Sequence, residues 1–481
     1  MRSEINLHRS FVLIILGIAS GLAALLIKRL DYALSIAFIW IALVVIVVFP
    51  EWKLGVVLAV LLGAPPFIDY ELAWTAITAW RSRSHGAIRL DITQPILCAF
   101  DLCIMLAAVA SIYQRRASEN TRATHLPLWY TIGLLLLSCL RLVSSANAII
   151  HYPQFSQTAW SGITSILRVP LVTLVTATCL SSGRGVRSTE VGLSVGVILF
   201  VAQSLYVSAV KHGGLTFGYI QLTGLVPGPG ATGALMVLVV PILVSGALIA
   251  ADYRHRSIMI VASIAGLGLA LLTYSRNVIA GAMVSALVLY IGSRQSGFHM
   301  PRKVVAGFVL AIVAASRIAS DWVMTKFRAT FSADLGSRIN LGARYAIWGL
   351  ACTLIKANWL LGHGTNMWGI IAPGSAKNVH NAFLQFAIEN GVPALILFIS
   401  LVALACVHGF SDLRQTEFAC TNELAAFKLG ALSGLIGYCT SQLVSSSLGH
   451  VRVNPVFWIA VAALLAPQYK TGEEVDSIGR R

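Results

Sequence analysis

Long runs of apolar residues, separated by short polar stretches, recur along most of the 481-residue chain. Each run predicts a membrane-spanning helix, because a helix needs about 20 apolar residues to cross a bilayer and satisfies its own backbone hydrogen bonds there. The runs are too continuous for the alternating pattern of a transmembrane β-barrel. The candidate spans are residues 11–27, 32–49, 54–68, 92–113, 126–144, 158–180, 191–210, 230–251, 257–274, 277–293, 303–320, 391–409, 425–446 and 454–467. Since two of them are short, the pattern predicts an all-α polytopic membrane protein with about 12 to 14 transmembrane helices.

The composition excludes several classes of protein. Hydrophobic residues make up 57% of the chain and charged residues only 11%, against a usual charged share of about 25%. A soluble enzyme or a disordered chain needs more charge than this. The eight cysteines form no CxxC pair and mostly lie inside apolar runs. We interpret them as buried apolar residues and not as metal ligands or a disulfide framework.

Motifs that would hold a metal or a nucleotide are absent from the sequence. It contains no HExxH pattern and no DxD-type acidic pair. The glycine- and proline-rich stretch 224–230 lacks the GK[ST] ending of a phosphate-binding loop. We interpret it as an ordered outer turn, which either approaches a substrate closely or only reverses the chain. Any chemistry is therefore expected to be metal-independent and to need no cofactor.

Positive charge is concentrated on alternate connections between the spans. The net charge is +16, which we attribute to the lysines and arginines of cytoplasmic loops and not to nucleic-acid binding. The predicted topology then places both termini in the cytoplasm. The first run, 11–27, is not followed by a cleavage site and a soluble domain, so we interpret it as a retained span.

One connection is much longer than the others. The predicted organisation is spans 1–11 in residues 1–320, a large outer loop in 321–390, C-terminal spans in 391–467 and a polar cytoplasmic tail in 468–481. Long loops in compact proteins are usually functional. The outer loop is therefore where we expect a site.

Three arginines near the outer face are candidate ligands for an anion. Arg276 follows Ser275 between two apolar runs, where a charge is costly unless it reaches water, pairs or has a function. Arg338 and Arg344 lie in the long loop, and the pattern around Arg344 predicts an amphipathic helix over 341–356. The planar donor fork of arginine suits a diphosphate. The simpler interpretations are a snorkelling side chain at 276 and a solvated charge at 344.

Two histidines lie in the same loop. His363 stands between glycines and is interpreted as a loop residue. His380 directly precedes Asn381, a favourable N-cap for a helix predicted over 382–390. Because the unperturbed pKa of histidine suits proton abstraction near neutral pH, His380 is a candidate general base. The alternative is a histidine that merely precedes a helix.

Charged residues also occur inside the predicted spans, and they include Asp101, Arg168 and Arg317. Such residues usually face the interior of a helix bundle and pair there. A pair between Asp101 and Arg168 is one possibility that the sequence alone does not decide.

Taken together, these motifs resemble those of the bacterial O-antigen ligase and O-antigen polymerase superfamily. The resembling segments are Ser275-Arg276, the turn at 224–232, Arg344-Tyr-Ala-Ile-Trp348, Leu361-Gly362-His363-Gly364, and His380-Asn381 followed by nine residues and Gly391. Where the ligase pattern has glycine, threonine or tyrosine three residues after that last glycine, this chain has Ala394.

The resemblance implies a GT-C-like membrane glycosyltransferase with a periplasmic site, in a bacterial inner membrane. It implies a glycan donor linked to undecaprenyl diphosphate and, for a ligase, lipid A-core as the acceptor. By the same resemblance, Arg276 and Arg344 would bind the diphosphate, and His380 would activate the acceptor hydroxyl or support the diphosphate. Arg338 is predicted as a further diphosphate ligand from its place in the long loop and not from the resemblance. Asn381 and Gly391 support the site. Beyond donor, acceptor and membrane lipid, no cofactor is implied.

Other activities are weighed beside ligation. A polymerase that lengthens lipid-linked repeats and a protein O-oligosaccharyltransferase use the same donor chemistry. A transporter of lipid-linked glycan would explain intramembrane charges, but no repeat relates the two halves of the chain and only one outer loop is large. A membrane scaffold would leave the arginines and histidines of the loop unexplained.

Overall fold

A computed structural model describes residues 42–46, 49–63, 99–117, 126–153, 156–212, 229–273, 275–295, 341–372, 379–415, 423–450 and 452–467. Every regular element in these ranges is helical, which confirms the all-α prediction. Eight of the helices are long and apolar enough to cross a membrane. They are α6 (Leu128–His151), α7 (Ser156–Cys179), α8 (Gly183–His212), α9 (Pro229–Ile249), α10 (Tyr253–Leu272), α11 (Arg276–Gln295), α17 (Val392–Gln415) and α18 (Glu423–Gln442).

The remaining helices are shorter or flank the bundle. They are the 3-10 helix η1 (Pro50–Trp52), α3 (Lys53–Gly63), α5 (Ala99–Ala117), α14 (Leu341–Ala357), α15 (Trp368–Ile371), α16 (Ala382–Asn390) and α19 (Val453–Leu465). The predicted spans 11–27 and 303–320 and the predicted tail 468–481 lie outside the described residues. The predicted amphipathic helix over 341–356 corresponds to α14, and the predicted helix over 382–390 corresponds to α16.

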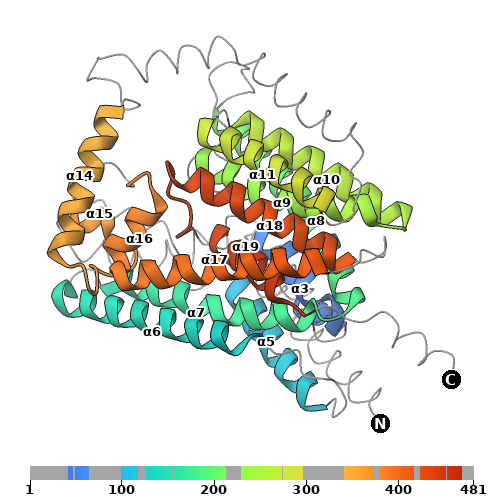
Figure 1. The fold of residues 1–481 in the computed structure, drawn as a ribbon, viewed down its shortest axis with the longest axis horizontal. Coiled ribbons are helices and arrows are strands. Elements are labelled where there is room, and N and C mark those ends of the chain that lie inside the picture. Colours follow the sequence, from blue (N-terminus) through green and yellow to red (C-terminus); the bar gives the residue numbers. More distant parts are fainter. Residues whose placement is uncertain are drawn as a thin grey trace, which may run out of the picture.

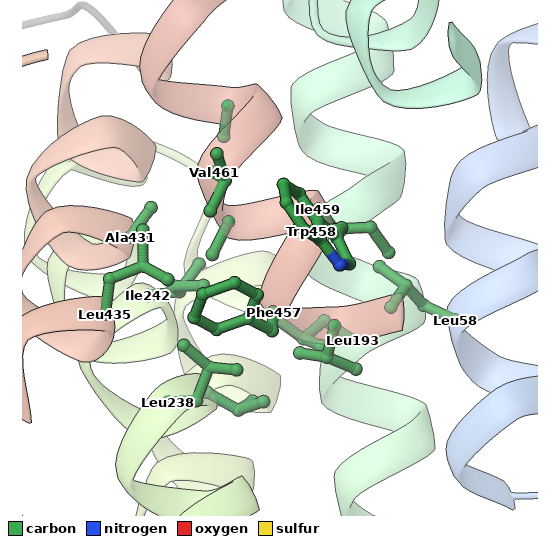
Figure 2. Packing of buried hydrophobic residues seen from close by; sticks show 14 of the residues in the cluster. Leu58, Leu193, Leu238, Ile242, Ala431, Leu435, Phe457, Trp458, Ile459 and Val461 are labelled. Carbon is green, nitrogen blue, oxygen red and sulfur yellow. The ribbon is translucent and has the colours of Figure 1, made fainter. Parts of the chain in front are cut away.

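Helices α9, α18 and α19 form the centre of the bundle. In α9 and α18, 89% and 83% of the spanning segment is buried inside the protein. Figure 2 shows Phe457 and Trp458 of α19 packed among side chains of neighbouring helices, including Leu238 of α9 and Leu435 of α18. Lipid tails are as apolar as these side chains, so this core is stabilised by close packing more than by removal from water.

Glycines let the central helices approach closely. A Cβ at Gly434 of α18 would meet the carbonyl of Leu238 in α9, and a Cβ at Gly437 would meet the carbonyl of Gly281 in α11. Close backbone approach through small residues is the usual way in which helices associate in membranes. The three helices that begin or end near Arg276 are thereby held in fixed positions.

A buried ion pair joins α5 to α7. The Arg168 guanidinium donates to both carboxylate oxygens of Asp101, at 2.5 and 2.8 Å, and both side chains are almost fully buried. Of the pairings that the sequence left open, the structure shows this one. Since an unpaired charge inside the membrane is costly, mutual neutralisation accounts for both residues without a transport role. Arg317 lies outside the described residues.

The bundle has two distinct ends. At one end, Arg187 at the start of α8 pairs with Glu423 at the start of α18 at 2.9 Å. At the other end, the last turns of α6 contact the segment between α14 and α16, since Ser145 and Thr365 are hydrogen-bonded at 3.4 Å. Figure 1 shows α14, α15 and α16 gathered beside the C-terminal end of α6 and the N-terminal end of α17. We name this second end the site end.

Candidate active site

His380 is placed by the start of α16. The Oδ1 atom of Asn381 accepts hydrogen bonds from the backbone N–H groups of Phe383 and Leu384, both at 3.0 Å, which is the predicted N-cap. Its Nδ2 donates to the carbonyl of Leu443, at the end of α18, at 3.0 Å. His380 itself has φ +56°, a backbone conformation that a non-glycine residue adopts at a cost of about 1–2 kcal/mol. Its neighbours therefore hold it there.

Arg344 is brought to His380 by the packing of α14. The indole N–H of Trp348 donates to the carbonyl of Val379 at 3.0 Å, directly before His380. Trp368, Val379 and Ile388 are buried in a small apolar cluster between α14, α15 and α16. Arg344 lies in the first turn of α14 and is half-buried. One side of this amphipathic helix is therefore docked on the residues that precede and follow His380.

Arg276 is the first residue of α11, after Ser275, whose carbonyl accepts hydrogen bonds from Val278 and Ile279. Burial lowers the pKa of Arg344, and the positive charge of Arg276 lowers it further. Burial also lowers the pKa of His380, and the charge of Arg344 adds to this effect. Arg344 thus lies within electrostatic range of both Arg276 and His380, and the lowered pKa of His380 favours its neutral form near pH 7.

Several helix N-termini meet at this point. Arg276 and Arg344 lie in the first turns of α11 and α14, and His380 directly precedes the N-cap of α16. The start of α9 joins them, because Gly230 is adjacent to the side chain of Asn277. Helix N-termini carry partial positive charge and bind anions, phosphate groups in particular. The site end therefore combines two guanidinium groups with four helix dipoles of the same sign.

The far end of α16 is held against α6 and the α14–α15 loop. The backbone N–H groups of His363 and Gly364 donate to the carbonyls of Ile388 and Glu389, both at 2.8 Å. The His363 ring is hydrogen-bonded to the carbonyl of Leu354 at 3.2 Å. His363 lies in a loop, as predicted, and its contacts there are with backbone atoms.

Two glycines allow these segments to cross. Gly362 and Gly391 have φ of +70° and +85°, and a Cβ at Gly391 would meet the carbonyl of Leu360. Only glycine adopts this region of backbone space without strain. The predicted supporting role of Gly391 therefore has a physical basis, which is the placement of α16.

Sequence reasoning missed a buried polar network at this crossing. Arg141 of α6 donates to Asn390 Oδ1 at 3.3 Å and lies over the ring of Phe386. Thr365 donates to the same Asn390 oxygen at 2.8 Å. Burial raises the pKa of Glu389 to about 7, although hydrogen bonds and the charge of Arg141 favour its carboxylate form. A charge inside the predicted span 126–144 was the one available signal.

The remaining sequence predictions fall outside the described residues. Arg338, predicted as a third arginine of the site, belongs to an undescribed segment, as do all but the last residues of the turn at 224–230. In the part of the chain that the structure describes, no group of three histidine, cysteine or acidic side chains is arranged to hold a metal ion.

These observations define a multi-pass all-α membrane protein with a cationic site at one end of its helix bundle. Residues 258–399 match the family model described as O-antigen ligase, and this match supports membership of the O-antigen ligase and polymerase superfamily. The matched segment contains Arg276, Arg344, His380 and Gly391. Membership indicates a glycosyl-transferring enzyme that acts on glycan and lipid-linked substrates. A search among curated proteins found no match.

The crossing at Gly391 leads to a prediction about stability. Gly391→Ala is expected to destabilise the protein by about 1–3 kcal/mol, because the substitution combines an unfavourable φ with a clash against Leu360. Gly349→Ala is the matched control, since a Cβ at this exposed position in α14 meets nothing within 4 Å. Thermal unfolding of the purified protein in detergent measures both. Equal melting temperatures for the two variants would contradict the role assigned to Gly391.

Proposed function

We propose that this protein transfers a glycan from undecaprenyl diphosphate to a sugar hydroxyl of an acceptor, with ligation onto lipid A-core as the leading assignment. The observation that carries the proposal is the convergence of Arg276, Arg344 and His380 at helix N-termini, inside the segment that matches the O-antigen ligase family. Two cations and a neutral base are the groups that such a transfer needs.

The diphosphate is the natural occupant of the cationic part of the site. The charge of Arg276 disfavours that of Arg344, and a dianionic group between them would replace this repulsion by attraction. Arg338 is proposed as a further ligand of the same group.

The reaction then follows from the charges. His380 takes the proton of the acceptor hydroxyl, and the hydroxyl oxygen bonds to the anomeric carbon of the donor sugar. The bond between that carbon and the diphosphate oxygen breaks, and its electron pair leaves with undecaprenyl diphosphate. Arg276 and Arg344 stabilise the negative charge that grows on this leaving group. Because these side chains supply both kinds of assistance, the proposed transfer is metal-independent.

Polymerisation is the second candidate within this class. Ala394 stands where the ligase pattern has glycine, threonine or tyrosine, and it is fully buried in α17. A polymerase and a protein O-oligosaccharyltransferase would use the same donor half of the site. Mass analysis of the product separates the three, since the glycan is found on lipid A-core, on a second lipid-linked repeat or on protein.

We further propose that the site end faces the periplasm and that both termini are cytoplasmic, in a bacterial inner membrane. The opposite end carries exposed arginines at the starts of α8 and α10 and at the ends of α11 and α17, and these are Arg184, Arg187, Arg254, Arg256, Arg294 and Arg414. Short loops rich in arginine remain in the cytoplasm.

This orientation predicts a labelling pattern. In a cysteine-free background, a membrane-impermeant thiol reagent added to spheroplasts is expected to label Trp359→Cys at the site end and not Tyr253→Cys at the opposite end. Both positions are exposed, at 57% and 79% of the residue's full surface, so both should react after permeabilisation. Labelling of Tyr253→Cys alone in intact spheroplasts would reverse the proposed topology.

The catalytic proposal is tested by three substitutions. Arg276→Ala, Arg344→Ala and His380→Ala are each expected to lower transfer by about 10²–10³-fold, because each removes stabilisation of a charge that develops in the reaction. Arg254→Ala, which removes an exposed arginine at the opposite end, should leave transfer unchanged. Reconstituted protein supplied with an undecaprenyl-diphosphate glycan and candidate acceptors gives the measurement. Full activity in all three site variants, at normal protein levels, would disprove the site.

The lowered pKa of His380 predicts a pH profile. A general base must be neutral, and its pKa lies below the ordinary value of 6.5. Activity, measured as kcat/KM, should therefore be constant above pH 6.5 and fall only as pH drops through this lower pKa. In Arg344→Gln one of the two causes of the depression is removed, so the residual activity should fall at a higher pH than in the wild type. An acidic limb centred above pH 6.5 in the wild type would exclude His380 as the base.

A further inference from the structure

A neutral polar cluster adjoins the arginines, beginning with Asn277. The hydroxyl of Ser275 donates to Asn277 Oδ1. This hydrogen bond fixes the orientation of the amide, so that Nδ2 is on the side away from the Ser275 hydroxyl. That nitrogen is buried and has no hydrogen-bond partner among the residues that the structure describes. A buried donor without an acceptor costs about 1–3 kcal/mol, so such groups usually have a partner when the protein is in use.

The amide nitrogen faces a position without a side chain. A Cβ placed on Gly230, at the start of α9, would lie 3.6 Å from Asn277 Nδ2, 3.6 Å from Ser275 Oγ and 3.4 Å from Ser445 Oγ. Two segments thus direct polar atoms at this glycine, namely the start of α11 and the loop after α18. The chemistry of this cluster is that of uncharged hydroxyl and amide groups.

The cluster borders both halves of the proposed site. Asn277 follows Arg276 in the first turn of α11. Ser445 lies two residues after Leu443, whose carbonyl accepts the hydrogen bond from Asn381 beside His380. A ligand held by Arg276 on one side and approached by His380 on the other therefore has Asn277 and Ser445 as neighbours.

We propose that Asn277 and Ser445 form a subsite for the sugar that is bonded directly to the diphosphate, with Asn277 Nδ2 donating to an oxygen of that sugar. This inference rests on the proposed function, because it takes the diphosphate to lie at Arg276 and Arg344. An amide donor and a hydroxyl match the hydroxyl and acetamido oxygens of a sugar, whereas the arginines match phosphate oxygens. Gly230 leaves the space that the sugar oxygen occupies.

The experiment compares two probes on the purified full-length protein in nanodiscs. One is undecaprenyl diphosphate alone, and the other is undecaprenyl diphosphate carrying a single N-acetylglucosamine. The wild type is expected to bind the sugar-bearing probe more tightly. In Asn277→Leu, which keeps the side-chain size and removes the donor, affinity for the sugar-bearing probe should fall about tenfold, as expected for one lost hydrogen bond, while affinity for undecaprenyl diphosphate stays the same.

A second variant guards against misfolding of the first. Gly230→Ala places a methyl group at ordinary contact distance from its neighbours, so the protein should fold, and it fills the proposed space. It should show the same selective loss. Asn147→Leu, at a half-buried asparagine of α6 outside the cluster, is the matched control and should bind both probes as the wild type does.

The outcomes test the sugar subsite and the proposed function separately. Selective loss of affinity for the sugar-bearing probe supports the subsite. Equal loss for both probes shows that Asn277 contacts the diphosphate and overturns the sugar assignment. No change in either affinity, or a wild type that does not distinguish the probes, also overturns it. If Arg276→Ala and Arg344→Ala bind undecaprenyl diphosphate normally, the proposed function fails, whatever Asn277 does.

Discussion

Repulsion between two arginines is the interaction on which the candidate site depends. Arg276 and Arg344 come from different helices, α11 and α14, and the charge of Arg276 makes that of Arg344 less favourable. The packing of α14 overcomes this repulsion, since Trp348 is hydrogen-bonded to Val379 and an apolar cluster closes beneath it. Under the proposed function, two like charges that packing holds close together form a site for an anion before the anion binds.

Contacts at both ends of α16 fix the position of His380, which directly precedes the helix. It is fixed at its start by Asn381 on Leu443, and at its end by Arg141, Thr365 and the His363–Gly364 backbone. These contacts join α6 and α18, which belong to distant parts of the sequence. The motif glycines and His363 are therefore explained by geometry, because they let the chain cross itself where α16 ends. The residue with a proposed chemical role, His380, lies at the other end of the same helix.

Local patterns predicted what local physics determines. The apolar runs gave the long helices, Asn381 gave the N-cap of α16, and the spacing around Arg344 gave α14. Pairings across long sequence distances leave no such pattern. Arg141 and Asn390 are 249 residues apart, and nothing near either residue indicates the other. Sequence reasoning likewise did not identify Asn277, because its proposed role depends on Gly230 and Ser445, which lie near it only in the folded bundle.

The coupling between Arg344 and His380 has a consequence for the sequence of events on the proposed enzyme. In the empty site the imidazole is a poor proton acceptor, because a neighbouring cation and burial both oppose its protonation. A bound diphosphate would offset that cation and make the imidazole more basic. On the proposed enzyme, His380 would therefore take a proton most readily while the donor is bound. Occupancy of the diphosphate position and basicity at the acceptor position would in this way rise together.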